Sequence, residues 1–194
     1  MAEYPDARFL TSADAERQFV PDDGVEIAVA GRSNAGKSSA INVIVNRRGF
    51  ARTSKAPGRT RLVNFFSLRD GRRLVDLPGY GFARVTDAVR RHWDELLSAY
   101  FRRRESLAGL FLIVDMRRGI TDADRQMMRF AEDVGLPIHV LATKADKLKR
   151  GQRATALLRI EKEFGERATV QAFSALNRDG VEEARARLEA FFAG

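Results

Sequence analysis

The residues with the clearest chemistry lie between Gly31 and Ser38. Their order, Gly-x-x-x-x-Gly-Lys-Ser, is that of a loop whose backbone N–H groups surround a phosphate. Lys37 would place its charge on the β- and γ-phosphates of a nucleotide, and the Ser38 hydroxyl would ligate Mg²⁺. The expected phosphate contacts of this loop are Gly31, Arg32, Ser33, Asn34, Ala35, Gly36, Lys37, Ser38 and Ser39.

A second set of residues is expected at the outer phosphate and the metal ion. Asp76-Leu77-Pro78-Gly79 ends a strand-like run, where a carboxylate can hold Mg²⁺ through a water molecule. The Gly79 N–H would then sense the γ-phosphate, as switch loops do. The expected nucleotide contacts in this segment are Asp76, Leu77, Pro78 and Gly79.

Residues 47–59 lack hydrophobic periodicity, and we interpret them as a long, mobile and functional loop. Thr60, at its end, is our choice for the second Mg²⁺ hydroxyl, and Thr53 is the alternative. Gly58, Arg59 and Thr60 are the expected nucleotide contacts here. The predicted metal ligands are Ser38, Thr60 and, through water, Asp76; the predicted catalytic groups are Lys37, Thr60 and Gly79.

Two later loops distinguish guanine from adenine. Asp146 closes the segment Thr143-Lys144-Ala145-Asp146, which follows a buried strand at the end where ligands bind in open α/β sheets. Its carboxylate can accept from N1–H and the exocyclic amine of guanine, a pair of donors that adenine lacks. The Lys144 stem can lie along the base, and N–H groups after the last strand can reach the guanine O6. The predicted guanine contacts are Thr143, Lys144, Ala145, Asp146, Phe173, Ser174 and Ala175.

This ordered set of motifs resembles the TRAFAC-class GTPases, and more closely the EngB (YihA/YsxC) family of bacterial ribosome-assembly GTPases. The matching segments are 31–39, 57–60, 64–66, 76–81 and 143–146, and the resemblance runs from about Phe9 to the C-terminus. It implies GTP binding and hydrolysis, Mg²⁺, and a role in assembly of the large ribosomal subunit from its rRNA-rich precursor. Older descriptions of the family speak of cell division and septation.

The chain departs from the general GTPase pattern in three places. Thr143 stands where most GTPases have Asn, and Leu176 where many have Lys, so the grip on the nucleotide should be looser. Tyr80 follows Gly79 where many GTPases place a Gln that orients the attacking water, so we expect slow intrinsic hydrolysis. In some relatives an Asn at the position of Asn34 helps to hold K⁺, and we hypothesise that K⁺ stimulates turnover.

The elements that must position these loops alternate along the chain. Apolar runs at 25–30, 108–115, 136–143 and 168–173 indicate strands, and 62–68 with 73–77 indicates a hairpin. Helices are expected at 37–46, 87–104, 121–134, 150–164 and 181–192. This pattern predicts a three-layer α/β P-loop GTPase fold with a mostly parallel six-stranded sheet and one antiparallel edge strand. Residues 1–24 are expected to be a leader packed on a single GTP-binding domain, 25–194.

Composition limits the classes of partner and site. The 194 residues carry a formal charge of +8 and contain no Cys, which excludes disulfides and Cys-based zinc sites. Paired and tripled arginines make RNA a natural partner. No apolar run approaches the ~20 residues that span a bilayer, so we expect a cytoplasmic, monomeric protein that does not bind membranes. The alternatives are a P-loop small-molecule kinase, a membrane-trafficking GTPase, and a basic RNA-binding adaptor that holds GTP or GDP as a structural ligand with little turnover.

Overall fold

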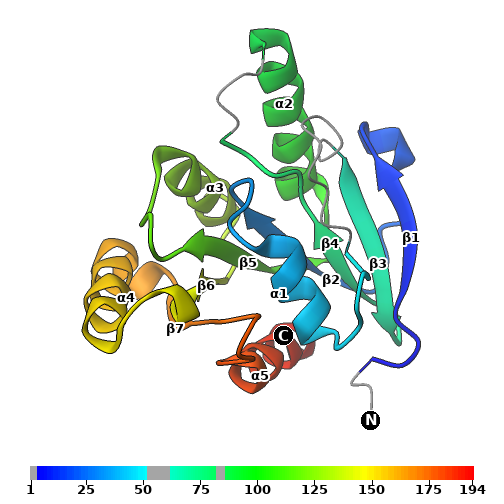
Figure 1. Ribbon diagram of the computed structural model, residues 1–194. Coiled ribbons are helices and arrows are strands. Elements are labelled where there is room, and N and C mark those ends of the chain that lie inside the picture. Colours follow the sequence, from blue (N-terminus) through cyan, green and yellow to red (C-terminus); the bar gives the residue numbers. More distant parts are fainter. Residues whose placement is uncertain (1–3, 52–61, 82–85) are drawn as a thin grey trace.

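The computed structural model describes residues 4–51, 62–81 and 86–194, and in these residues seven strands form one sheet (Figure 1). The strand order is β1-β3-β4-β2-β5-β6-β7. The strands are β1 Arg8–Ala13, β2 Val25–Gly31, β3 Val63–Arg69, β4 Arg72–Asp76, β5 Leu107–Asp115, β6 Ile138–Thr143 and β7 Thr169–Ala172. The helices are α1 Lys37–Ile44, α2 Asp87–Arg103, α3 Asp122–Glu132, α4 Arg150–Phe164 and α5 Val181–Ala193, with short 3₁₀ turns at Glu16–Gln18, Ala145–Lys147 and Gly165–Arg167.

The predicted fold class is confirmed, but the predicted number of strands is wrong. Strands β4, β2, β5, β6 and β7 are parallel, and β3 pairs antiparallel with β4 across a tight turn at Asp70-Gly71. The seventh strand, β1, comes from the expected leader and pairs antiparallel with β3, so β1 takes the edge in place of β3. Only the last of the six residues of β1 is buried, and its sequence RFLTSA lacks the apolar alternation that predicts a strand. Pairing with β3, through Phe9↔Phe66 for example, supplies what the local sequence does not.

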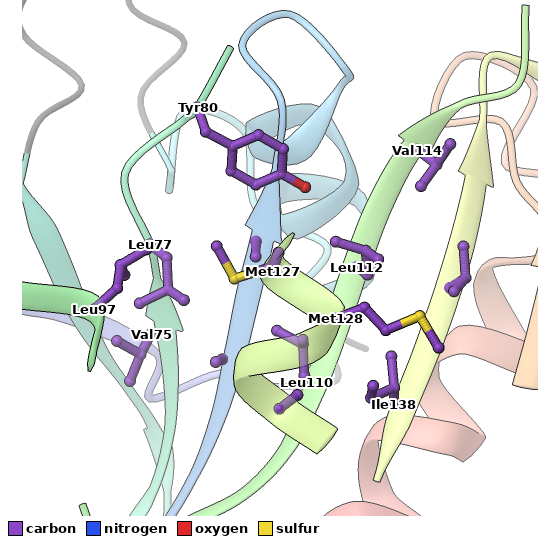
Figure 2. Packing of buried hydrophobic residues seen from close by; sticks show 14 of the residues in the cluster. Val75, Leu77, Tyr80, Leu97, Leu110, Leu112, Val114, Met127, Met128 and Ile138 are labelled. Atoms are coloured by element: carbon purple, nitrogen blue, oxygen red, sulfur yellow. The ribbon is translucent and has the colours of Figure 1, made fainter. Parts of the chain in front are cut away.

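Helices cover both faces of the sheet and make two cores. On one face α2, α3 and α4 pack against alternate residues of the central strand, including Leu110 and Leu112 (Figure 2). On the other face α1 and α5 pack against the intervening residues, Phe111 and Ile113 (Figure 1). Strands buried on both faces are apolar at successive positions, which explains why the runs at 108–115 and 136–143 predicted the sheet.

A buried ionic cluster fixes the end of the sheet opposite the nucleotide-binding loops. Glu26, at the start of β2, is fully buried, and its Oε1 accepts from Arg73 Nε at 2.8 Å and from Arg104 Nη2 at 2.7 Å. The Tyr100 hydroxyl donates to Glu26 Oε2 at 3.2 Å. Because a buried carboxylate is stable only when it is paired and hydrogen-bonded, these contacts hold the end of α2 against β2 and β4.

None of the helices in the described ranges has both the length and the apolar character needed to cross a membrane.

Candidate nucleotide-binding site

The phosphate-binding motif forms the loop between the end of β2 at Gly31 and the start of α1 at Lys37. Gly36 precedes the helix with a φ of 104°, and Asn34 has a φ of 64°. Such a left-handed conformation suits glycine, and it turns the backbone so that successive N–H groups face one side. Ser38 and Ser39 lie in the first turn of α1. No side chain among the described residues caps this helix start, which is the geometry that receives an anion.

The loop is held from behind by the segment after β4. The Ser33 N–H donates to the Tyr80 carbonyl at 2.9 Å, and the Ala35 N–H donates to the Arg32 carbonyl at 2.9 Å. Gly79 lies so close that a Cβ there would stand 3.0 Å from Ser33 Oγ. The structure therefore places Gly79 directly beside the phosphate-binding loop.

Lys37 and Asp76 come together in an ion pair. Asp76 is nearly buried at the end of β4, and its other oxygen accepts from Asn64 Nδ2 at 3.5 Å. Asn64 in turn accepts from the Ser12 hydroxyl of β1 at 2.6 Å. The edge strand that sequence reasoning missed is thus connected to the predicted phosphate and metal groups through one intervening side chain.

The donor set near Asp76 suits Mg²⁺, which prefers hydroxyl, carboxylate and phosphate oxygens. Two predicted ligands, Ser38 and Asp76, lie at the start of α1 and the end of β4. One hydroxyl and one carboxylate are a donor set that suits an ion whose other ligands are phosphate oxygens. Among the described residues no cluster of three or more His, Cys, Asp or Glu side chains could hold a metal ion. The predicted contacts Gly58, Arg59 and Thr60, and the alternative Thr53, lie outside the described residues.

The Thr143–Asp146 loop is bonded directly to the phosphate-binding loop. The Thr143 hydroxyl donates to the Ala35 carbonyl at 2.5 Å and lies 3.1 Å from the Val114 carbonyl. Lys144, with a φ of 62°, donates from Nζ to the Asn34 carbonyl. Thr143 therefore joins the two loops with a hydroxyl where most GTPases use an amide.

Asp146 is bonded to the loop that follows β7. The Ala145 N–H donates to the Phe173 carbonyl at 3.2 Å, and the Ser174 hydroxyl donates to Asp146 Oδ1 at 2.7 Å. The hydrogen bond from Ser174 lowers the pKa of Asp146 below its usual value, so the carboxylate stays ionised and can accept from two base N–H groups. Ala175 follows directly, whereas Leu176 is 72% exposed.

Asp115 is a site residue that sequence reasoning missed. It ends β5 opposite Thr143 in the sheet register, and its Oδ2 accepts from Lys144 Nζ at 2.9 Å and from Arg117 Nη2 at 2.7 Å. Burial alone would raise the pKa of Asp115, but the hydrogen bonds from Arg117 and Lys144 outweigh it and lower the pKa to about 2. An Asp that closes a buried strand was the available signal, since the carboxyl ends of parallel strands meet at one edge.

The Tyr80 side chain is buried in the core. The side chain is 5% exposed, packs near Met127 in the core, and meets the Trp93 ring at a centroid distance of 6.0 Å (Figure 2). Its hydroxyl donates to Asp124 Oδ1 at 2.7 Å. Burial, together with the Asp124 carboxylate, raises the pKa of Tyr80 well above its usual value. In this conformation Tyr80 is a core residue and not a group that orients water.

Comparisons with known proteins agree with this geometry. The family model described as "50S ribosome-binding GTPase" matches residues 26–144. A probable GTP-binding protein EngB from Vibrio parahaemolyticus is 48% identical over 98% of this chain and 88% of its own length. A probable EngB from Coxiella burnetii is 44% identical over 98% of this chain and 94% of its own length.

Among solved structures, the crystal structure of a probable GTP-binding protein engB superposes with a TM-score of 0.71 at 23% identity. It covers 87% of this chain and 99% of its own. This likeness supports the fold, while the sequence relatives carry the family assignment. The chain therefore belongs to the EngB family of GTP-binding proteins, which are GTPases and so hydrolyse GTP.

Proposed function

We propose that this protein is a GTP-driven switch that binds the large ribosomal subunit, or its precursor, during assembly. The observation that carries the proposal is the direct bonding of the Thr143–Asp146 loop to the phosphate-binding loop through Lys144 and Thr143. One nucleotide can then contact both loops, with its phosphates at the start of α1 and its guanine at Asp146. The P-loop contacts named above and the residues from Phe173 to Ala175 are assigned to this nucleotide.

The residues of this chain divide the work of hydrolysis. Lys37 and the N–H groups of the 31–38 loop stabilise the charge that develops on the phosphates, and water is the nucleophile. When bound between Ser38 and Asp76, Mg²⁺ would neutralise charge on the β- and γ-phosphates. With a nucleotide bound, Lys37 would pair with the phosphates in place of Asp76, and the Asp76 carboxylate would then be free to help hold the ion.

The γ-phosphate would be sensed by the segment after β4. Gly79 lies beside Ser33, and the next residue, Tyr80, is bonded through its carbonyl to the same loop. A γ-phosphate that accepts a hydrogen bond from Gly79 would therefore shift the segment that contains Tyr80, whose side chain contacts Asp124 in the core. Because the Tyr80 phenol is buried and bonded to Asp124, we propose that intrinsic hydrolysis is slow and that a partner or K⁺ completes the site.

The ribosomal partner rests on the family description and on charge. A formal charge of +8 favours an RNA-rich particle. Such a role places the protein in the cytoplasm, where we propose that it acts as a monomer. Since β1 pairs with β3, we propose that residues 1–24 fold together with 25–194.

Sedimentation with ribosomal particles tests the proposal. The protein is spun with large-subunit particles in GDP and in a non-hydrolysable GTP analogue, at two salt concentrations. Preferential pelleting in the GTP-like state that survives moderate salt is expected. Pelleting that ignores the nucleotide and disappears with salt contradicts the switch, because that is the behaviour of a basic protein on any RNA. Undetectable turnover with particles present favours the adaptor function instead.

A further inference from the structure

An arginine-lined cleft of about 230 Å³ lies between α3, α4 and the loop that joins β5 to α3. Arg117 and Arg118 come from the loop, Arg125 from α3 and Arg159 from α4. The floor is apolar and includes the buried Ile160 side chain. None of these arginines belongs to the nucleotide contacts assigned above, but Arg118 also lines the hollow beside the phosphate-binding loop, so the cleft adjoins the nucleotide site.

The four arginines differ in how their charge is balanced. Arg125 pairs with Asp122 and with Glu163, at 2.8 and 2.7 Å. Arg118 and Arg159 are both exposed, and within the part of the chain that the structure describes neither takes part in an ion pair. Among the described residues the cleft therefore presents two arginines outside any ion pair, beside Arg125, which shares its charge with two carboxylates, one of them Glu163 of the cleft wall.

We infer that this cleft binds the phosphate backbone of RNA, an inference that rests on the proposed function. Guanidinium groups match phosphate oxygens bidentately and also stack on bases, and Arg118 and Arg159 are exposed enough to do both. The apolar floor suits a ribose or base edge beside the phosphate. Acidic peptides offer fewer charges per unit length than RNA, so the net charge of +8 favours RNA as the occupant.

The cleft also has a direct connection to the nucleotide site. Arg117 donates from Nε to Asp115 Oδ1 at 3.0 Å, and the same carboxylate holds Lys144 beside the phosphate-binding loop. A phosphate in the cleft competes with Asp115 for Arg117. RNA docking and nucleotide binding therefore act on one shared carboxylate, and coupling of this kind is reciprocal.

The test replaces the two cleft arginines that form no ion pair among the described residues and compares this variant with one that loses the same charge elsewhere on the surface. The cleft variant is Arg118→Gln with Arg159→Gln. The control is Arg8→Gln with Arg187→Gln, which are also exposed and without an ion pair among the described residues, on β1 and α5. Binding of a labelled 12-nucleotide oligouridine is measured by fluorescence anisotropy against salt at pH 7.5, together with pelleting on large-subunit particles in the GTP analogue.

We expect the cleft variant to bind RNA at least tenfold more weakly and to lower the slope of log affinity against log salt by about 1 for each lost contact. The control should lose less than threefold. The melting curve should be unchanged in both variants, which establishes that they are folded.

Three results would overturn the inference. Equal losses of RNA affinity in both variants would mean that the net positive charge of the protein binds RNA without a specific site. Wild-type protein that fails to bind the oligonucleotide would mean that the cleft holds no RNA backbone. Unchanged RNA binding with lost pelleting would assign the cleft to an acidic segment of a ribosomal protein. Failure of the wild-type chain to pellet in either nucleotide state would instead contradict the proposed function itself.

Discussion

Replacing Tyr80 by Phe should destabilise the fold while leaving GTP hydrolysis nearly unchanged. The hydroxyl donates to Asp124 Oδ1 at 2.7 Å, and Asp124 is 2% exposed. A hydrogen bond to a buried charged group contributes about 1.5–3 kcal/mol, and its loss leaves one carboxylate oxygen without that donor. Asp124 Oδ2 keeps its bond from the Thr121 hydroxyl at 2.8 Å, so we expect a loss of about 2 kcal/mol.

Urea unfolding followed by circular dichroism measures this loss. For a chain of 194 residues, about 2 kcal/mol lowers the melting temperature by roughly 4–8 °C. Because Asp124 also caps α3 with Thr121, Asp124→Asn alone removes more than one interaction. A double-mutant cycle of Tyr80→Phe and Asp124→Asn isolates the pair, and we expect a coupling energy of about 1–2 kcal/mol.

The same variants separate a structural role from a catalytic one. If Tyr80 acts only as a core residue, its hydroxyl does not stabilise the transition state, and kcat for GTP should stay within about threefold of wild type. A tenfold fall in kcat would instead correspond to a loss of about 1.4 kcal/mol of transition-state stabilisation. Unchanged stability together with a tenfold lower kcat would refute this reasoning and make the phenol a catalytic group.

Three further predictions concern the phosphates, the sheet and the cation. Lys37→Ala should lose most of its GDP affinity by calorimetry while its circular dichroism stays native, because Lys37 supplies charge to the phosphates; unchanged affinity would refute the phosphate-loop assignment. Burial, with Arg187 nearby, lowers the pKa of His139 from 6.5 to about 4 despite the hydrogen bond to Gln171. The folded state therefore binds this proton less readily than the unfolded chain. Protonation of His139 does not lower the free energy of unfolding above pH 6.5, but it lowers that free energy by about 3 kcal/mol as the pH falls to 4. Urea unfolding at both pH values should show a flatter dependence in His139→Asn, and an equally steep one would contradict the assignment. Turnover should be faster in K⁺ than in Na⁺ at matched ionic strength and the difference should vanish in Asn34→Ala, whereas equal wild-type rates would exclude a role for K⁺.

Much of the fold and of the site follows from local sequence. The Gly31–Ser38 spacing requires one loop geometry, and the buried runs at 108–115 and 136–143 predicted the central strands within two residues. Thr121 and Asp124 form a capping box at the start of α3. These features depend on neighbours within a few positions, so the sequence carries them directly.

The remaining features depend on residues far apart in the chain. Strand β1 has one buried residue and becomes a strand by pairing with β3, which starts 50 residues after β1 ends. The Asp115–Lys144 and Tyr80–Asp124 contacts join residues 29 and 44 positions apart, and no local pattern specifies them. The residues next to Tyr80 in the sequence suggest a switch residue, whereas its contact with Asp124 of α3 makes it a core residue.

One measurement tests most directly whether the phosphate-binding loop and the Thr143–Asp146 loop form a single guanine nucleotide site. Wild-type protein and Asp146→Asn are titrated calorimetrically with GDP, ADP and xanthosine diphosphate, whose base carries a carbonyl in place of the exocyclic amine. Wild type should bind GDP strongly and the other two weakly, and the variant should prefer the xanthine nucleotide, because its amide donates where the carboxylate accepted. Retention of GDP preference in Asp146→Asn, or equal binding of ADP and GDP by wild type, would contradict the assignment of the base to Asp146.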